Sequence, residues 1–370
     1  MQQRVIISQD IEHDLAQAIA ETEHDRVFVL TDDITQECCL PKVASLFAKH
    51  NATTITIRHD DTNKTLATLA EVWTALQRGG ATRHSLLVNL GGGMVTDLGG
   101  FAAATFKRGI NFINIPTTLL AMVDAAVGGK TGINFGGLKN EVGAFANARY
   151  VIVNTCFLDT LDTANLCSGY AEMLKHSLIS NAQMWAEHVN FDILQPDLAE
   201  LQRMVAASIA VKEHIVADDP HEHGIRKALN FGHTIGHALE EFSMQQPGGA
   251  VVSARLLPLA RARTAPKNTL LHGYVVAFGL IGELYISARK VGFPTARLHQ
   301  TARFIRENYG AVAFTCDDYP TLLNLMRHDK KNTSDTINFT LLHDIGDIRI
   351  NQTATDEEIR EALDFIREGY

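Results

Sequence analysis

The stretch VNLGGGMVTDLGGFAAA, residues 88–104, combines the end of an apolar strand, three glycines and the start of a helix. Gly91, Gly92 and Gly93 permit a turn in which the backbone comes close to a bound pyrophosphate, whose charge the helix N-terminus favours. The spacing differs from the common G-x-G-x-x-G fingerprint, so a tight turn without a ligand is the alternative interpretation. The stretch therefore predicts a nucleotide-type α/β unit around it.

Short apolar runs alternate with helical segments on both sides of this stretch, up to about residue 160. The runs RVFVLTDD, TTITIRH, SLLVNLGGG and INFINIPTT are rich in β-branched residues and end in polar or glycine residues, as buried parallel strands do. Helix-period segments, such as 35–49 and 64–78, lie between them. The alternation predicts a Rossmann-like, doubly wound α/β domain over residues 1–160.

The rest of the chain has a different pattern, in which strands nearly vanish and only TINFTLL and DIRIN suggest a late hairpin. Helical periodicity covers the segments 163–188, 197–217, 225–243, 272–290, 297–308, 319–328 and 356–368. We therefore expect an all-α domain over residues 161–370.

Composition excludes several classes of protein. The chain has 370 residues and a formal net charge of −9, from 33 basic and 42 acidic side chains. This charge gives no general attraction for nucleic acid or for an anionic membrane. No apolar run approaches the roughly 20 residues of a transmembrane helix, and the N-terminus lacks a signal-peptide core. The five cysteines are odd in number and form no C-x-x-C pair, which is typical of reduced thiols in a cytoplasmic protein.

Two histidines in LNFGHTIGHALE, residues 229–240, are candidates for metal binding. His233 and His237 are four residues apart, so a helix places them on one face, one turn apart. One interpretation is a pair of metal ligands. The alternative is one partly buried and one solvated histidine, and a third ligand is needed to favour the metal.

Two other segments supply further ligands. Glu172 lies in SGYAEMLKHSLI, and His272 lies at the start of the apolar helix in LLHGYVVAFGLIGELY. Together with either His233 or His237, they form a set of one carboxylate and two imidazoles from three helices. Such a set suits a zinc-type site with an open position.

Charged residues also occur in otherwise apolar surroundings. Residues 116–145 hold Asp124, Lys130, Lys139 and Asn140 among glycines and apolar residues, in a stretch that we expect to be buried. Lysines on a glycine-rich backbone suit a phosphate or a carboxylate ligand. Surface lysines on a flexible loop are the alternative.

A second polar set precedes and includes the histidine pair. Arg226, Asn230, His233 and His237 follow one another at spacings of four, three and four, which predicts one shared helical face. A polar run on an otherwise apolar helix is typical of a ligand site rather than of a solvated face. Other polar residues in this part of the chain are Lys175, Lys212, Glu213 and Glu222.

Taken together, NLGGGMVTDLGG, FKRGINFINIPTTLLAMVDAAVGGKTGIN, GYAEMLKH, LNFGHTIGHALE, LLHGYVVAFGL and MRHDKKN resemble the 3-dehydroquinate synthases. The resemblance runs from about residue 25 to 345, with the motifs in family order. It implies a dehydroquinate synthase-like fold, NAD and one divalent metal, zinc or cobalt, at one active site. The implied reaction converts 3-deoxy-D-arabino-heptulosonate 7-phosphate into 3-dehydroquinate and phosphate. Its stages are transient oxidation by NAD, phosphate elimination, re-reduction and an intramolecular aldol closure.

The resemblance also implies roles for individual residues. Glu172, His233 and His272 match the metal ligands, whereas His237 matches a substrate position near the phosphate, so the two histidines would hold different partners. Arg108 matches a substrate-binding arginine lent by the neighbouring subunit, which implies a homodimer. The positions implied to be catalytic are Lys130, Lys175, Lys212, Glu222, Arg226, Asn230 and His237. The other substrate positions are Asp124, Asn140 and either Lys330 or Lys331. The NAD positions are Asp32, Lys64, Gly91, Gly92, Gly93, Asp97, Thr117, Thr118, Lys130, Lys139 and Thr160.

Two departures from the family pattern stand out. His272 follows His237 at a much greater distance than usual, because a basic segment without acidic residues, 247–267, lies between them. We expect an extended surface loop there, and a basic flap over the anionic substrate is the alternative. The DDTNK sequence that ends at Lys64 also lacks the glutamate that is usual in the family. This departure affects the expected contacts with the adenosine of NAD.

Three rival functions follow from the same residues. A cyclase acting on sedoheptulose 7-phosphate would use the same scaffold, but Asn230 and His237 keep the dehydroquinate synthase pattern. A metal-dependent polyol dehydrogenase would release NADH, and Glu172 with the phosphate-binding lysines argues against it. A binding protein without activity is the third rival, which the intact ligand, lysine and glycine sets oppose.

Overall fold

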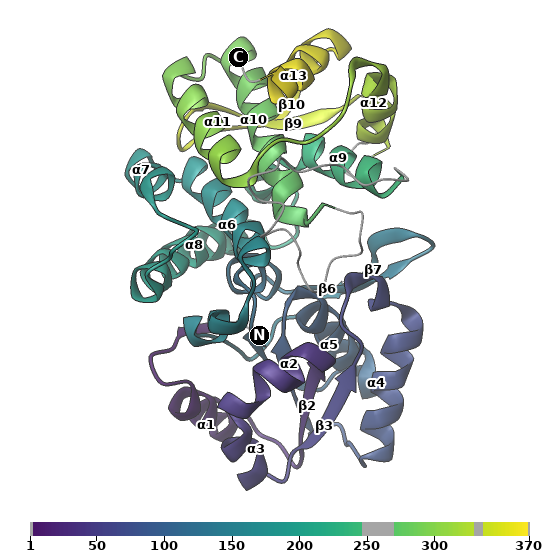
Figure 1. Cartoon of the computed structure of the whole chain (residues 1–370). Coiled ribbons are helices and arrows are strands. Elements are labelled where there is room, and N and C mark those ends of the chain that lie inside the picture. The colour runs from purple at the N-terminus through teal and green to yellow at the C-terminus, as the bar shows by residue number, and fades with distance from the viewer. Residues whose placement is uncertain (1–2, 246–269, 329–335, 369–370) are drawn as a thin grey trace. The chain divides into compact units, whose positions relative to one another are not determined.

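The computed structural model describes residues 3–245, 270–328 and 336–368, and these form two compact units (Figure 1). The first unit comprises Met1–Leu161 and Asp197–Ile209, and the second comprises Asp162–Pro196 and Ala210–Tyr370. The domain bounds predicted from the sequence, 1–160 and 161–370, stay a prediction. Within the described residues, no helix combines the length and the apolar character that a membrane span requires.

A parallel six-stranded sheet forms the centre of the first unit, in the order β1-β8-β5-β4-β2-β3. Its two neighbouring strands β4 and β2 are buried along their whole length, as their predominantly apolar sequences predict. The fold class predicted from the sequence is confirmed. The strands are β1 (Arg4–Ile7), β2 (Val27–Asp32), β3 (Thr53–Ile57), β4 (Leu86–Gly91), β5 (Asn111–Pro116) and β8 (Tyr150–Val153). The α-helices of this unit are α1 (Ile11–Glu21), α2 (Asp33–Cys38), α3 (Ala44–Lys49), α4 (Leu66–Arg78) and α5 (Gly93–Thr105).

The glycine stretch forms the turn from β4 to α5, and its glycines are required by close packing. A Cβ atom on Gly91 would lie 2.6 Å from Cβ of Val95, and one on Gly99 would lie 2.1 Å from Oδ1 of Asn89. Contacts this short leave no room for a side chain, so α5 can pack this closely on β4 only with glycine at both positions.

An antiparallel hairpin, β6 (Lys130–Phe135) with β7 (Leu138–Phe145), follows β5 and was not predicted. Its apolar side chains Phe135, Leu138 and Phe145 are more than half exposed. The expectation that residues 116–145 are buried is therefore wrong for this part of the stretch. The apolar composition of the hairpin could not predict this exposure, because burial depends on whether another element covers the hairpin.

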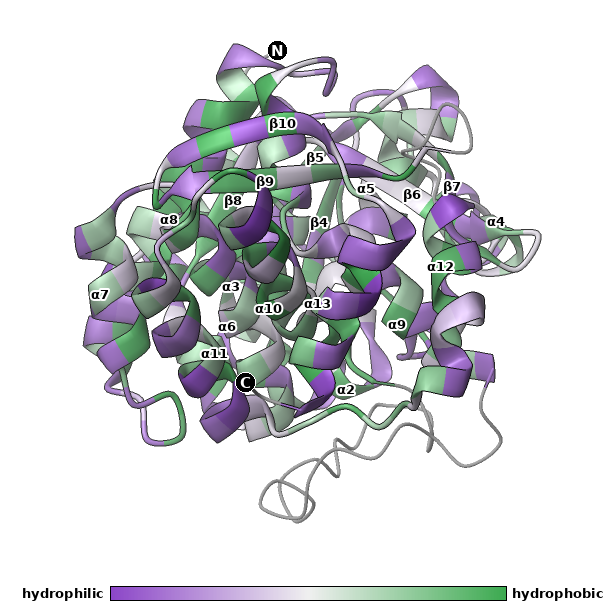
Figure 2. Ribbon diagram, turned by 90° about the horizontal axis from the view of Figure 1, so that it is seen from above, coloured by the Kyte–Doolittle hydropathy of each residue, from purple (hydrophilic) through white to green (hydrophobic). Residues whose placement is uncertain are grey.

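Helices dominate the second unit, as the sequence predicts, and α10 lies in its core. This helix packs against α6, α9, α11 and α13, and most of its residues are buried. Its predominantly apolar character is visible in Figure 2. The helices are α6 (Thr163–Leu178), α7 (Ala182–Asn190), α9 (His233–Gln245), α10 (His272–Lys290), α11 (Thr295–Tyr309), α12 (Tyr319–Arg327) and α13 (Asp356–Glu368). The predicted late hairpin is β9 (Asn338–Asp344) with β10 (Asp347–Thr353), and α8 (Leu198–Asp218) has residues in both units.

The predicted helix over 225–243 is interrupted. A short 3-10 helix, Ile225–Asn230, ends before Gly232, whose φ of +81° lies in the left-handed region, and α9 begins at His233. Arg226 and Asn230 therefore do not share one helical face with the two histidines, and that prediction is wrong. Spacing alone could not show the interruption, because the residues on both sides of it fit a helical period.

Candidate metal and substrate site

Glu172 is the buried centre of the candidate site. It lies on α6, whose side chains from Leu166 to Leu178 are all buried, and its own exposure is 0%. The N-terminus of this helix is capped by Asp162, whose side chain accepts a hydrogen bond from the N–H group of Asn165. A carboxylate in such surroundings costs free energy unless a cation or a ligand compensates for it.

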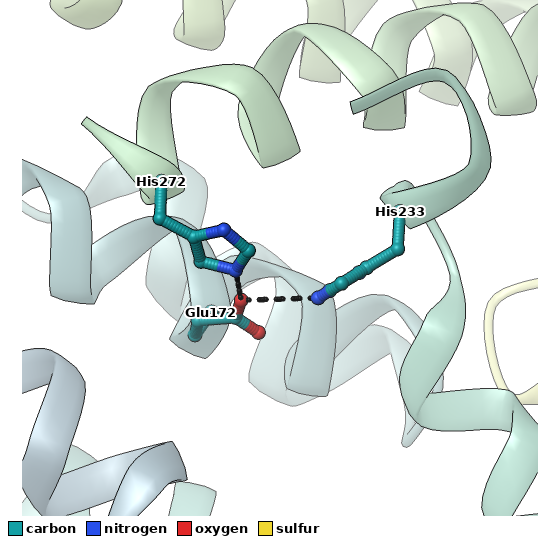
Figure 3. Close-up of side chains that lie close together, drawn as sticks. All are labelled: Glu172, His233 and His272. Atoms are coloured by element: carbon teal, nitrogen blue, oxygen red, sulfur yellow. Dashed lines mark ion pairs between the residues drawn. The ribbon is translucent and has the colours of Figure 1, made fainter. Parts of the chain in front are cut away.

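Two imidazoles face this carboxylate from two other helices (Figure 3). The Nε2 atoms of His233 and His272 each lie 3.4 Å from Oε1 of Glu172. Each histidine is the first residue of its helix, α9 or α10. One ligand atom from each of the three residues lies within 4.8 Å of the others, which is close enough for one ion to bind all three.

The charges around Glu172 favour its ionised form. The ammonium group of Lys175, one helical turn along α6, forms an ion pair with the second carboxylate oxygen. Burial opposes ionisation, but the charges of Lys175 and His233 outweigh it and hold the pKa of Glu172 well below its usual range. In the described part of the chain, neither carboxylate oxygen of Glu172 accepts a hydrogen bond of good geometry. A buried carboxylate with this unmet capacity, facing two imidazoles, fits a divalent metal.

The far side of each imidazole is also held. Nδ1 of His233 lies 3.1 Å from the carbonyl oxygen of Phe231, and Nδ1 of His272 lies 3.3 Å from Oε2 of Glu240. Because a carbonyl and a carboxylate accept hydrogen bonds, both contacts place a proton on Nδ1 and leave Nε2 directed toward Glu172. Burial opposes protonation of His272, but the adjacent carboxylates outweigh it and raise its pKa to about 10.

His237 lies beside this set but does not face Glu172 in the same way. It is half-buried, and its ring centroid lies 5.3 Å from that of His233 and 6.0 Å from that of His272. A second group of possible ligands, His237, Glu240 and His272, also lies within 4.8 Å. The geometry thus separates the two histidines of α9, with His233 at Glu172 and His237 at Glu240.

Glycines bring α9 and α10 unusually close together. A Cβ atom on Gly279 would lie 1.9 Å from the carbonyl oxygen of Gly232, and one on Gly236 would lie 3.0 Å from that of Val275. No side chain fits at the first position without moving the backbone. The two helices that begin with His233 and His272 are therefore held in contact along their backbones.

Glu283 of α10 fixes the start of α9 and was missed by the sequence analysis. Its fully buried carboxylate accepts hydrogen bonds from the backbone N–H groups of Gly232, Thr234 and Ile235, at 2.7 to 3.3 Å. The first N–H groups of a helix have no partners within the helix, and the helix dipole favours a negative charge there. Glu283 thereby anchors the turn that carries His233.

The other polar residues predicted for the site in the second unit are partly or fully buried. Asn230 donates a hydrogen bond to Glu222 at 2.6 Å, and the half-buried Glu222 has a φ of +63°. The guanidinium of Arg226 is buried and donates to the carbonyl oxygen of Pro220 at 2.6 Å. Lys212, on α8, is buried as well. Cationic side chains are thus held in the interior of the unit, where a negatively charged ligand would compensate for their burial.

In the first unit, several residues predicted to bind NAD lie around the glycine turn. Gly92 is the N-cap of α5, and a Cβ atom on it would lie 3.0 Å from Cγ2 of Thr118. The backbone N–H of Thr117 donates to the carbonyl oxygen of Gly91 at 3.0 Å. Asp32, by contrast, caps α2 by accepting a hydrogen bond from the N–H of Thr35 at 2.7 Å. At least one carboxylate oxygen of Asp32 is therefore engaged in capping α2.

Lys64 joins several of the other predicted residues. Its buried ammonium group lies 3.0 Å from Asp97, 3.4 Å from Asp61 and 2.5 Å from Oδ1 of Asn140. Lys139 lies 3.6 Å from Asp61, on the edge of the same cluster. These contacts neutralise Lys64 within the protein itself, so its charge is already balanced by carboxylates.

The remaining predicted residues belong to the first unit or lie outside the described residues. Lys130 and Thr160 are exposed in the first unit, and Asp124 is half-buried in a π-helical turn. Arg108 is exposed after α5, with a φ of +70°. Lys330, Lys331 and the basic segment 247–267 lie outside the described residues.

Comparisons with known proteins cover the whole chain. The family model described as 3-dehydroquinate synthase N-terminal matches residues 54–168, and the one described as 3-dehydroquinate synthase C-terminal matches residues 169–257. A 3-dehydroquinate synthase from Parabacteroides distasonis is 50% identical, over 100% of this chain and 99% of its own length.

Solved structures resemble the fold as well. A 2-deoxy-scyllo-inosose synthase complexed with carbaglucose-6-phosphate, NAD⁺ and Co²⁺ has a TM-score of 0.81 at 22% identity, covering 100% of this chain and 96% of its own. The 2-epi-5-epi-valiolone synthase of Streptomyces hygroscopicus, with NAD⁺ and Zn²⁺ bound, has a TM-score of 0.81 at 23% identity, covering 100% and 98%.

Proposed function

The chain belongs to the 3-dehydroquinate synthase family, and on that premise we propose that it converts 3-deoxy-D-arabino-heptulosonate 7-phosphate into 3-dehydroquinate and phosphate. The observation that carries the proposal is the set of Glu172, His233 and His272, built around a fully buried carboxylate, within a chain that matches a 3-dehydroquinate synthase along its full length. Such an enzyme is a phosphate-eliminating carbon–oxygen lyase that acts in aromatic amino-acid biosynthesis.

We propose that Glu172, His233 and His272 hold one divalent metal, zinc or cobalt. The donor set of one carboxylate and two imidazoles suits both ions, and the two solved relatives bind Co²⁺ and Zn²⁺ respectively. A bound ion would supply Lewis-acid polarisation of the substrate's hydroxyl oxygens. The chain's own contribution is to direct both Nε2 atoms toward Glu172 and to keep its carboxylate ionised through Lys175.

The glycine turn between β4 and α5 is the proposed site for NAD. Gly91 to Gly93 leave the backbone bare at the N-terminus of a helix, where a pyrophosphate is favoured. Bound NAD would supply a hydride acceptor that is restored within each turnover. Asp97 lies near the N-terminus of α5 and forms an ion pair with Lys64. We propose that Lys64 holds α5 and Asn140 in position through its contacts with both.

Substrate binding is assigned to the cationic and amide side chains. We propose that Arg226 and Lys212, buried in the second unit, compensate for the substrate carboxylate, and that Asn230 and His237 bind its phosphate and hydroxyls. Lys130 is also proposed to bind the phosphate. Glu222 positions Asn230 through the hydrogen bond between them.

We further propose a cytoplasmic homodimer. The exposed Arg108 follows α5 in a strained, left-handed conformation, which suits a side chain that reaches into the site of a neighbouring subunit. All five cysteines are free thiols in the structure, in keeping with a reducing compartment.

The decisive experiment measures phosphate release from 3-deoxy-D-arabino-heptulosonate 7-phosphate by metal-loaded protein with catalytic NAD, while NADH absorbance is followed in parallel. We expect phosphate release without lasting NADH, and its loss on addition of a chelator. The Glu172→Gln variant should be inactive. Glu241→Gln, which removes an exposed carboxylate from α9, is the matched control and should retain activity.

Each other result identifies a different function. Accumulating NADH would contradict the proposal in favour of a metal-dependent polyol dehydrogenase. Phosphate release only from sedoheptulose 7-phosphate would point to the related cyclase. Binding of metal and NAD without turnover of either heptose phosphate would indicate a binding protein.

A further inference from the structure

We propose that Glu240 is a positioning residue for the candidate metal site, because its carboxylate holds the imidazole of His272 in the orientation that directs Nε2 to Glu172. The inference rests on the proposed function, since it concerns the same metal. Glu240 is not among the residues that the sequence analysis selected.

The geometry places the ring of His272 between two carboxylates. Oε2 of Glu240 lies 3.3 Å from Nδ1, and Oε1 of Glu172 lies 3.4 Å from Nε2. Rotation of the imidazole would break both contacts. The Glu240 contact also requires the proton on Nδ1, so Nε2 is the nitrogen that releases its proton when a metal binds.

A comparison of the two imidazole ligands shows why His272 needs help from another helix. His233 is held by the carbonyl oxygen of Phe231, two residues before it in the chain. His272 differs from His233 in this respect. It is the first residue of α10, but the acceptor for its Nδ1 is Glu240 of α9. Glu240 lies seven residues after His233, so it reaches the site from the same helix face, two turns along.

Burial strengthens the argument. The Glu240 side chain is 8% exposed, so placing a carboxylate there costs free energy that an apolar residue would avoid. The exposed neighbour Glu241 shows that α9 carries charge at the surface without such a cost. The contact with Nδ1 of His272 gives this buried carboxylate a compensating partner.

The test measures metal affinity directly, by competition of a chromogenic chelator for Zn²⁺, in wild type and in the variants Glu240→Ala and Glu240→Gln. Loss of such an outer partner typically weakens metal affinity roughly 10- to 100-fold. We expect Glu240→Ala to show this loss and Glu240→Gln, whose amide oxygen can still accept from Nδ1, to lie between it and wild type. Glu241→Gln should bind Zn²⁺ as wild type does.

A second readout separates positioning from a purely structural effect. The visible spectrum of the Co²⁺-loaded protein reports the geometry around the metal, and we expect it to change in Glu240→Ala but not in Glu241→Gln. Thermal unfolding of the metal-free proteins tests folding, and the isosteric Glu240→Gln variant keeps the proposal testable if the alanine variant does not fold.

Several outcomes would overturn the proposal. Unchanged Zn²⁺ affinity and an unchanged Co²⁺ spectrum in both Glu240 variants would show that His272 is positioned without Glu240. Two Zn²⁺ ions per wild-type chain, with one lost in Glu240→Ala, would make Glu240 a ligand, in keeping with its closeness to His237. A wild-type protein that binds no metal would overturn the proposed function as well, whereas the first two outcomes leave that function intact.

Discussion

Glu172 and Lys175 form a fully buried ion pair next to two imidazoles. Removing one member of such a pair leaves the other charge without compensation in the protein interior, which typically costs about 3–5 kcal/mol. The pair therefore matters for the stability of the metal-free protein as well as for the proposed metal.

We expect Glu172→Gln to lower the free energy of unfolding of the metal-free protein by about 3 kcal/mol, because the ammonium of Lys175 loses its partner. Urea denaturation, followed by circular dichroism, measures this. The double variant Glu172→Gln with Lys175→Met should recover much of the loss, since no unpaired charge remains. A double variant that is as unstable as the sum of the two single ones would show that the pair is not coupled.

From the sequence alone, the set of proposed metal ligands contained one unresolved choice between two histidines. Spacing placed His233 and His237 on one face, and it could not decide which of them joins Glu172 and His272. The family resemblance selected His233, whose Nε2 in the structure faces Glu172 at 3.4 Å. Glu240 was within reach of the same helical spacing, since it lies three residues after His237. The sequence alone does not single it out, because an acidic residue on a helix is usually solvated.

At the scale of elements, the contact between α9 and α10 sets the distance between the two histidines. The Gly279–Gly232 approach and the Glu283 cap act on the same turn, just before His233. The interruption at Gly232 could not be predicted, because a left-handed glycine leaves the periodicity of the surrounding residues unchanged. Glu283 could not be predicted to cap α9, because its partners are backbone groups far away in the sequence.

Gly279→Ala tests this contact. The added methyl group would lie 1.9 Å from the carbonyl oxygen of Gly232, so the helices must separate, and overpacking of this kind costs about 1–3 kcal/mol. We expect a lower melting temperature together with weaker Zn²⁺ binding, measured by calorimetry and chelator competition. Glu241→Ala is the control, because it truncates an exposed side chain of α9 away from the contact with α10. Unchanged Zn²⁺ binding in Gly279→Ala would contradict the assignment.

At the scale of the whole molecule, composition and alternation predicted the fold class well. The parallel sheet of the first unit and the helices of the second are as expected, because each strand and helix carries its own periodic signal. The hairpin Lys130–Phe145 was missed, since its exposed apolar side chains resemble those of a core segment. Local sequence patterns do not contain the information on which surfaces are covered by other elements.

The proposed homodimer makes a prediction about mixed subunits. If Arg108 completes the site of its neighbour, Arg108→Ala and Glu172→Gln should each be inactive alone. Random mixing after unfolding and refolding together should restore about a quarter of wild-type activity, because half of the dimers then contain one intact site. Phosphate release measures this, with each variant refolded alone as the control. No recovery in verified mixed dimers would show that Arg108 does not act across subunits.

The first unit is built from two separate pieces of chain, Met1–Leu161 and Asp197–Ile209. The second piece contributes Gln202, whose amide donates to the carbonyl oxygen of Ser8 at 2.9 Å and accepts from the hydroxyl of Thr155 at 2.8 Å. Domains generally fold in order as they leave the ribosome. Here the first unit cannot complete these two contacts until the segment ending at Ile209 has been synthesised. Folding of the two halves during translation is thereby interleaved rather than sequential.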